Sequence, residues 1–347
     1  MFKKLYLFIF LSAVTSTVAL AQQSVDINFN GLGYLDNREY KAFIPRSRTY
    51  SGTRTALDFG LNLDSVNHFV VGVNGLHEFG AIPFFVDVAP VAYYHFQNKN
   101  WGFFAGEFPR EGQVSNFPRA LLNDTLRYFR PNIQGLLARY TSNNGKFTET
   151  GFIDWLSRQT DVEREQFMFG AEGKYRPDLY GPFYISHYFF LMHDAGAAIL
   201  LPDDHIGDNG GFEIRAGLDF SHKQTTFDSL SFEAGTLVGM QRERALTGWH
   251  MPAGFVASVY ASYHRLAFFD EFYRGQGAYI TYGDSYYEKS FYNRLDIIYT
   301  PFSFKNIKGQ FIASFHFSPG QFNDNQEVFR ISYDLGRKVL ARFKPDR

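Results

Sequence analysis

The sequence predicts an all-β fold, a transmembrane antiparallel up-and-down β-barrel of about sixteen strands, within a range of roughly 14–18. Three observations support this fold. Apolar and polar residues alternate in segments spread along the whole chain. After the N-terminal segment, no apolar run approaches the ~20 residues that a transmembrane helix needs. Aromatic residues make up 19% of the 347 residues, with 40 Phe and 22 Tyr, which suits a barrel with an apolar outer face.

The alternation is clearest in residues 212–220, FEIRAGLDF. Phe212 and Ile214 belong to one row, and Glu213 and Arg215 belong to the other. Successive side chains of a strand point to opposite faces, so one face is apolar and the other is charged. In a soluble sandwich the charged face would meet water, whereas in a membrane barrel it would meet the lumen. This segment alone fits both folds.

The expected strands follow from all such alternating segments, taken in chain order. They lie near 25–35, 52–63, 67–79, 83–96, 100–108, 132–142, 146–159, 164–175, 182–195, 211–222, 227–242, 250–263, 265–275, 291–301, 307–318 and 326–339. Most have about the length that a strand needs to cross an outer membrane.

The connections between these strands decide between barrel and sandwich. If the first strand rises outward, the long connections 36–51, 109–131, 196–210 and 276–290 all fall on the extracellular side. The opposite side then has only short turns, at 64–67, 98–100, 142–146, 177–181 and 223–226. Long extracellular loops with short periplasmic turns are typical of outer-membrane barrels. A soluble sandwich has no reason to sort its loops in this way.

The N-terminus resembles an export signal. Lys3 and Lys4 precede an apolar stretch over 5–20, and Ala19-Leu20-Ala21 has the form of a cleavage site. These features predict a secretory signal peptide over 1–21, removed on export, and a single barrel domain over 22–347. The chain has no Cys, so no disulfide braces the exported domain. We therefore expect the protein in the outer membrane of a Gram-negative bacterium.

The net charge of −1 gives no basic surface for a nucleic acid. The expected partners are outer-membrane lipid and either small hydrophilic solutes or glycans. An oligomer is compatible with the sequence, and no cofactor is expected.

The segments GYLDNREY (33–40), GTRTALDFGL (52–61), HEFG (77–80) and PRALLNDTLRYFRPNIQGLL (118–137) suggest a family. With them the chain resembles the porin-like outer-membrane β-barrels of Bacteroidota. The resemblance spans most of the mature chain. It implies a barrel in the outer membrane and carries no named activity.

Charged residues opposite the apolar rows are the first functional candidates. They are Arg54, Asp58, Glu172, Lys174, Glu213, Arg215, Asp219, Arg294, Asp296, Arg330 and Asp334. Lining a water-filled lumen, this mixed set would give a porin-like channel for passive or weakly selective passage of small hydrophilic solutes. The same residues would equally fill the lumen by pairing across strands. The rival function is a closed barrel that acts as a surface glycan- or protein-binding attachment factor through its extracellular loops.

Two loops carry further candidates. Arg119, Asp124, Arg127 and Arg130 would form a constriction favouring anionic solutes if their loop enters the lumen. They would otherwise belong to an external cap, held by Asp124 pairing with Arg127. Tyr282, Tyr286 and Tyr287 are candidate glycan contacts, with the aromatic belt at the membrane interface as the alternative for this Tyr-rich segment.

The segment LPDDHIGDNG (201–210) is a weak candidate for Ca²⁺, which prefers oxygen ligands. Its carboxylates are Asp203, Asp204 and Asp208, in a spacing that also occurs in ordinary turns.

Catalysis is not expected from the sequence. The pairs His77-Glu78 and His193-Asp194 lie near outer strand ends, but adjacent residues on a strand face opposite sides and cannot form a dyad. No G-x-S-x-G or H-E-x-x-H motif is present. A hydrolase at the rim would need His77 or His193 within ~3 Å of a carboxylate and a hydroxyl. The prediction is therefore a protein that is not an enzyme.

Overall fold

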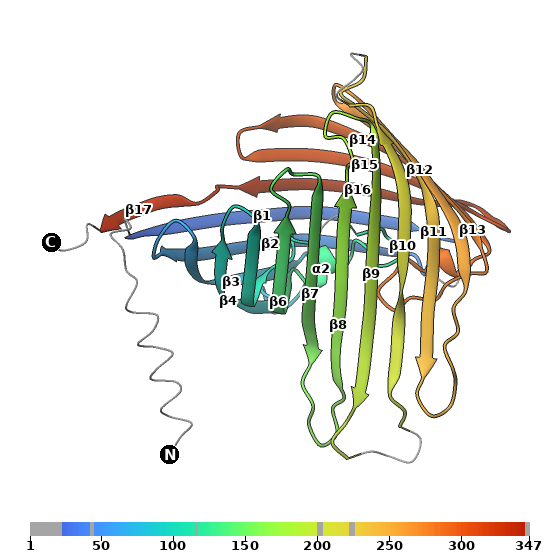
Figure 1. The fold of residues 1–347 in the computed structure, drawn as a ribbon, viewed down its shortest axis with the longest axis horizontal. Helices are drawn as coiled ribbons and strands as arrows, with labels where there is room; N and C mark the ends of the chain where they lie inside the picture. The colour runs from blue at the N-terminus through green and yellow to red at the C-terminus, as the bar shows by residue number, and fades with distance from the viewer. Residues whose placement is uncertain (1–22, 42–44, 115–116, 200–203, 222–225, 344–347) are drawn as a thin grey trace.

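The computed structural model describes residues 23–41, 45–114, 117–199, 204–221 and 226–343 (Figure 1). The expected signal peptide over 1–21 lies outside these residues. Within them, no helix has the length and apolar character that a membrane crossing requires.

Almost all of the described chain is β-strand. The strands are β1 (Gln23–Glu39), β2 (Arg48–Asn62), β3 (Asn67–Glu78), β4 (Asp87–Gln97), β5 (Trp101–Pro109), β6 (Asn132–Thr141), β7 (Phe147–Ser157), β8 (Glu165–Tyr175), β9 (Phe183–Gly196), β10 (Gly207–Asp219), β11 (Ser229–Glu243), β12 (Ala253–Tyr263), β13 (Leu266–Gly275), β14 (Phe291–Phe304), β15 (Ile307–Ser318), β16 (Gln321–Asp334) and β17 (Lys338–Phe343). Two short helical turns, α2 (Leu126–Phe129) and η1 (Ser285–Glu288), lie in the connections.

The sheet closes on itself. From β1 to β16 each strand pairs antiparallel with the next along the chain, and β1 also pairs with β16 and β17. Residues 30–39 of β1 pair with β16, and residues 23–27 pair with β17. These two strands share one place in the wall, so the barrel has 16 strand positions. The predicted fold class and strand number are confirmed.

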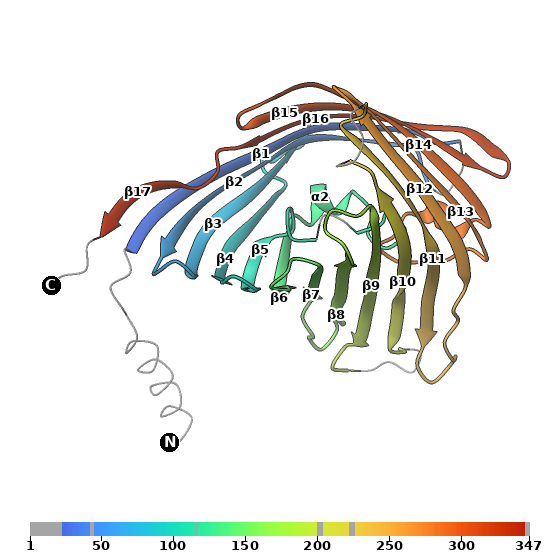
Figure 2. The same ribbon diagram turned by 45° about the horizontal axis from the view of Figure 1, so that its top comes forward.

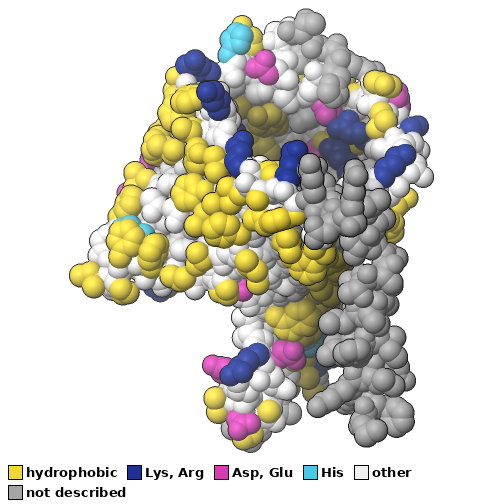
Figure 3. All heavy atoms as spheres, turned by 90° about the vertical axis from the view of Figure 1, so that its left-hand side faces the viewer, with side chains coloured by type: hydrophobic (Ala, Val, Ile, Leu, Met, Phe, Trp, Pro, Cys, Tyr) yellow, Lys and Arg dark blue, Asp and Glu magenta, His cyan; other side chains and the backbone are white. Residues whose placement is uncertain are grey.

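The alternating apolar and polar residues of the sequence form the outer and inner faces of the barrel wall. On β2 the side chains of Leu57 and Phe59 are exposed on the outside, while Arg54 and Asp58 are buried on the inside. On β10, Ile214 is 54% exposed, whereas Glu213 is fully buried. Figure 3 shows hydrophobic side chains spread over the outer wall and a hollow toward the top of the view. FEIRAGLDF therefore turns its apolar row outward.

The two ends of the barrel differ, and we name them by their connections. The loop end holds the connections 110–131 and 276–290, and the turn end holds 63–66, 98–100 and 305–306. The expected turn between β12 and β13 is present at 264–265, with His264 in a left-handed conformation (φ 54°). The expected strand at 83–96 starts later, at Asp87, because the preceding residues belong to the connection after β3.

The segment 110–131, with α2, folds into the barrel and does not extend away from it (Figure 2). Its side chains Phe117, Leu121 and Leu126 are buried in one cluster with wall residues such as Phe152 and Phe190. The segment 276–290 joins the same cluster through Ile280, Tyr286 and Tyr287. Apolar burial on this scale holds both segments against the inner wall.

An ion-pair cluster braces the seam between the chain ends. Arg337, in the break between β16 and β17, lies 2.7 Å from both Asp26 and Asp58 on the inner wall. Both carboxylates are nearly buried.

We expect Arg337→Gln to destabilise the closed barrel by about 1–3 kcal/mol, because two buried carboxylates lose their cation. The measurement is the temperature at which the folded barrel loses its faster mobility in SDS gels. Arg176→Gln is the matched control, since Arg176 also pairs with a wall carboxylate, Asp219, but away from the seam. An unchanged unfolding temperature for Arg337→Gln would contradict this account of the seam.

Candidate active site on the outer wall

One row of outward-facing side chains crosses five neighbouring strands near the loop end. The strand register places Trp155 opposite Phe167, Phe167 opposite His193, His193 opposite Asp208, and Asp208 opposite Arg242. On β9, His193 shares its face with Ile185, which is 40% exposed on the outer wall. On β10, Asp208 shares its face with the exposed Ile214 and Leu218. Three aligned polar residues therefore interrupt the apolar outer wall at one level.

The centre of the row is a hydrogen-bonded pair. His193 Nδ1 lies 2.6 Å from Asp208 Oδ1. An ionised carboxylate can only accept, so Nδ1 carries the proton and donates it to Asp208. Nε2 of the neutral ring then carries a free lone pair. This is the tautomer that a general base requires. Phe167 packs against the His193 ring at 5.0 Å between centroids and helps to fix its orientation.

Two guanidinium groups hold the carboxylate from the other side. Arg242 Nε lies 3.0 Å and Arg244 Nε 3.1 Å from Asp208 Oδ2. Asp208 is only 2% exposed, whereas the side chains of Arg242 and Arg244 are 27% and 47% exposed. Arg242 also lies over the Trp249 ring, 4.2 Å from its centroid. The carboxylate is thus fixed on three sides, while positive charge faces outward.

A second pair on the same strand provides a comparison. His187, also outward-facing on β9, lies with Nε2 3.2 Å from Glu149 Oε1. This pair is near the turn end, no arginine of the described residues forms an ion pair with Glu149, and both side chains are more than one-third exposed. The arginine-flanked arrangement is therefore a feature of the loop end, not of every outward histidine on this strand.

His193 and Asp208 were both named from the sequence, but neither was assigned to this pair. His193 was considered together with its neighbour Asp194, and that pair was excluded as a dyad; Asp194 faces inward and binds Arg164. Asp208 was assigned to a weak Ca²⁺ site. Asp204 instead binds Arg164, and Asp203 lies outside the described residues. No group of three or more potential metal ligands occurs in the described ranges.

Arg242 and Arg244 were missed. A signal for Arg242 does exist in the sequence: it shares the row of Phe232 and Val238, so a charge ends a largely apolar outward row. The register that brings it to Asp208 is not visible in the sequence.

Most of the candidate lumen residues lie buried on the inner wall. Seven are buried there, namely Arg54, Asp58, Glu213, Arg215, Arg294, Asp296 and Arg330. Three others, Glu172, Lys174 and Asp219, are half-buried, and Asp334 is exposed. Many pair with an opposite charge, as Arg294 does with Asp296 at 2.6 Å. Arg215 binds Glu213 and Glu271 at 2.6 and 2.9 Å. A role in selecting permeant solutes stays a prediction.

Asp124 anchors the inward-folded segment 110–131. It lies 3.2 Å from Arg119 and 3.3 Å from both Arg38 and Arg330 on the wall. Its expected partner in an external cap, Arg127, binds Glu111 instead. Burial acts to raise the pKa of Asp124, but these guanidinium groups outweigh it and hold the pKa well below its usual range.

Two further contacts dock the segment 110–131 onto the wall. Tyr128 stacks on Tyr34 at 4.1 Å, and Arg54 donates to the Tyr128 carbonyl. Within the segment itself, the carbonyl oxygen of Arg130 accepts a hydrogen bond from Arg110 at 3.0 Å.

The three tyrosines proposed as glycan contacts face the interior. Tyr286 and Tyr287 are each 1% exposed, and Tyr282 is partly buried against the same cluster. Tyr286 donates to Asp324 at 2.7 Å, and Tyr287 donates to Glu271. The expectation of outward rings is therefore wrong for Tyr286 and Tyr287, because the connection that carries them packs inside the barrel and does not extend away from it.

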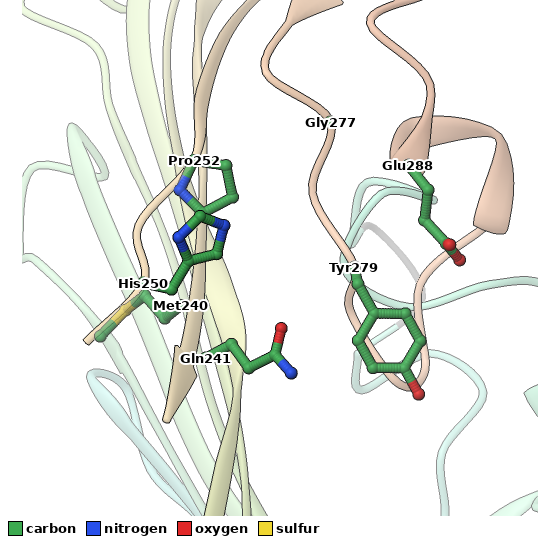
Figure 4. Close-up of a pocket in the computed structure, with 7 residues that line it drawn as sticks. All are labelled: Met240, Gln241, His250, Pro252, Gly277, Tyr279 and Glu288. Carbon is green, nitrogen blue, oxygen red and sulfur yellow. The ribbon is translucent and has the colours of Figure 1, made fainter. Parts of the chain in front are cut away.

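A cavity of about 200 Å³ lies at the rim, between the β11–β12 connection and the segment 276–290 (Figure 4). Gln241, His250, Tyr279 and Glu288 line it. In Figure 4 Gln241 and Tyr279 approach each other from opposite walls, whereas Glu288 lies further along the second wall. No hydrogen bond joins these four side chains in the described chain, so they form no preassembled dyad.

Comparisons with known proteins give two results. A family model described as lipid A 3'-O-deacylase-type matches residues 16–341. The anion-selective porin of Comamonas acidovorans aligns with a TM-score of 0.54 and 11% identity, over 90% of this chain and 100% of that chain. OpdK of Pseudomonas aeruginosa, solved with vanillate, aligns with a TM-score of 0.52 and 10% identity, over 90% and 98% of the two chains. No curated protein matches the sequence.

The porin likeness confirms the outer-membrane barrel fold, and at this identity it shows the fold alone. The family match overturns one prediction. The chain was expected not to be an enzyme, and the matching family is an enzyme family. The sequence-based prediction considered linear motifs and adjacent residues, whereas the candidate pair in the wall joins residues on two different strands.

Proposed function

Because the chain belongs to the lipid A 3'-O-deacylase-type family, we propose that it is an outer-membrane esterase that removes an acyl chain from lipid A. The active site is assigned from one observation, the pair of His193 and Asp208, whose side chains lie 2.6 Å apart on the outer wall. Lipid A is an acylated and phosphorylated sugar lipid of the outer leaflet. A site on the outer wall meets such a substrate from the side, within the membrane plane.

The depth of the site supports this substrate. We place the loop end outside the cell, as in other outer-membrane barrels. The row then lies at the extracellular edge of the apolar band, flanked by Trp155 and Trp249. Tryptophan is favoured at the level of lipid headgroups, where sugar esters meet acyl chains. Ionic groups such as Asp208 and Arg242 are also far less costly there than at the membrane centre.

The mechanism follows from the tautomer of His193. Nε2 takes a proton from a water molecule as the water oxygen attacks the ester carbonyl. Asp208 stabilises the imidazolium that forms, and Arg242 and Arg244 supply positive charge close to the developing oxyanion. The intermediate then breaks its bond to the sugar oxygen, which receives the proton from Nε2. The products are a fatty acid and a free sugar hydroxyl.

Water is the nucleophile in this proposal because the hydrogen bonds of His193 in the described chain run to Asp208 and to no side-chain hydroxyl. The rim hydrolase considered from sequence needed both a carboxylate and a hydroxyl near His193. The structure supports the first requirement, a carboxylate near His193.

The test is incubation of the purified, folded protein with lipid A, followed by mass spectrometry. We expect a lipid A lighter by one acyl chain, together with the matching free fatty acid. Unchanged lipid A in the presence of a heat-modifiable, folded barrel would overturn the proposal.

The two arginines should recognise the phosphate groups of the substrate, because guanidinium pairs strongly with phosphate. We expect Arg244→Gln to raise KM for phosphorylated lipid A about tenfold and to leave KM for dephosphorylated lipid A unchanged. Arg244 is suited to this test because its side chain is 47% exposed. An equal effect on both substrates would show that Arg244 acts through Asp208 and not through phosphate.

Passage of small hydrophilic solutes is the second candidate function. The porin fold and the inward charges support it, through a lumen narrowed at the loop end by the segments 110–131 and 276–290. Conductance in a planar bilayer tests it, and a folded barrel that gives no steps would exclude passive passage.

A further inference from the structure

A second cavity lies at the loop end of the lumen, lined by the inward-folded segment 110–131 and, from the wall, by Arg330. Its volume is about 240 Å³. Its charged lining consists of four arginines and two carboxylates, namely Arg110, Arg119, Arg127, Arg330, Glu111 and Asp124. The cavity is inside the barrel, whereas the proposed esterase site is on the outer wall, so the two are independent.

Arg110 is the most deeply placed of these cations. It is 6% exposed, pairs with Asp154 and donates through Nε to the Arg130 carbonyl at 3.0 Å. Its Nη1 is buried without a hydrogen-bond partner in the described part of the chain. An unpaired buried donor on a charged group is costly, so this atom favours an added acceptor.

The two carboxylates do not neutralise the lining. Asp124 is shared among Arg38, Arg119 and Arg330. Glu111 binds Arg127 at 3.0 Å and is 66% exposed, so solvent screens much of its charge. With Asp154 bound to Arg110, the four lining arginines face three carboxylates, one of which is shared with Arg38. An excess of positive charge therefore remains in a partly desolvated space, where an anion gains more than it would in water.

Apart from Asn123, the remaining lining is apolar. Phe117, Leu122 and Leu126 are buried side chains that border the cavity. The volume is below the roughly 300–1,000 Å³ of pockets for drug-sized ligands, and above the ~150 Å³ of an engineered cavity that holds benzene. The volume therefore suits one small ring or short chain, and the arginines suit a single anionic group on it.

We propose that this cavity binds a small organic carboxylate with an apolar body. The guanidinium groups hold the carboxylate by charge-assisted hydrogen bonds, and the apolar side chains contact the body.

The test is isothermal titration of the full barrel in detergent with benzoate, benzamide and inorganic phosphate. Benzamide has the shape of benzoate without its charge, and phosphate has charge without an apolar body. We expect saturable binding of benzoate that is at least tenfold tighter than that of either other probe. Equal affinity for benzoate and benzamide, or for benzoate and phosphate, would overturn the proposal, as would the absence of benzoate binding.

Two variants locate the binding. Arg119→Gln and Arg127→Gln change partly exposed cations of the lining, and each is expected to weaken benzoate binding about tenfold. Arg176→Gln, which alters an arginine–aspartate pair outside the cavity, is expected to leave it unchanged. Folding of each variant is checked by heat-modifiable mobility. Unchanged affinity in both lining variants would place benzoate elsewhere and overturn the assignment.

Discussion

His193→Gln is expected to lower the rate of lipid A deacylation by about 10²–10⁴-fold, the usual contribution of a general base. Glutamine keeps a side chain of similar reach but has no group that takes a proton from water near neutral pH. Asp208→Asn is expected to have an effect of the same order. An amide does not stabilise the imidazolium, and it also holds the ring less strictly in the required tautomer. Rates are measured from the release of fatty acid.

The matched control is His187→Gln. His187 lies on the same strand and the same face, also beside a carboxylate, but near the opposite end of the barrel. We expect this variant to retain wild-type activity. Full activity of His193→Gln in a folded barrel would refute the role assigned to His193. Equal loss in both histidine variants would show that the outer wall responds generally to such changes.

Asp124→Asn is expected to release the segment 110–131 from the wall and to raise single-channel conductance several-fold over the wild type. The neutral amide leaves Arg38, Arg119 and Arg330 without their shared anion. Removing one partner of a buried ion pair costs about 3–5 kcal/mol of folding stability. Because this cluster is partly exposed, we expect a cost at the lower end of that range. Planar-bilayer recordings and the thermal unfolding of the barrel measure the two effects.

The pH dependence of this anchor follows from its lowered pKa. A carboxyl group with a lowered pKa in the folded state contributes its stability fully above its unfolded pKa of about 4, and loses it as pH falls through the folded value. The pKa of Asp124 is held well below the usual range, so wild-type conductance should not vary between about pH 5 and pH 8 through this group.

Asp161→Asn is the control for Asp124→Asn, because Asp161 is an exposed aspartate in another loop-end connection. It should change neither conductance nor unfolding temperature. Wild-type conductance in Asp124→Asn would mean that the apolar cluster alone holds the segment in place.

Sequence and structure contribute differently to the two candidate sites. The outward or inward direction of each strand residue was readable, because the side-chain period of a strand is two and lipid and lumen impose opposite polarity. His193 was visible as a polar residue near a strand end, and Asp208 as a carboxylate in the connection that follows. Their pairing was not, because it depends on which residues of β9 and β10 lie opposite each other across the connection 197–206.

The inward segments show a similar limit. The aromatic and charged content of 110–131 was compatible with an external cap or a constriction. Docking onto Tyr34, Arg54 and Arg330 decides among them, and these wall residues come from strands at opposite ends of the sequence. No local sequence pattern in the segment 110–131 indicates these wall residues as its partners.

The sequence by itself determined the barrel, its strand number and the polarity of its two faces. These features follow from local alternation and from the medium on each side of the wall. Only the tertiary structure decided the outer His193–Asp208–Arg242 row and the arginine-lined cavity. Both depend on the register and closure of the sheet, which bring together residues that are distant along the chain.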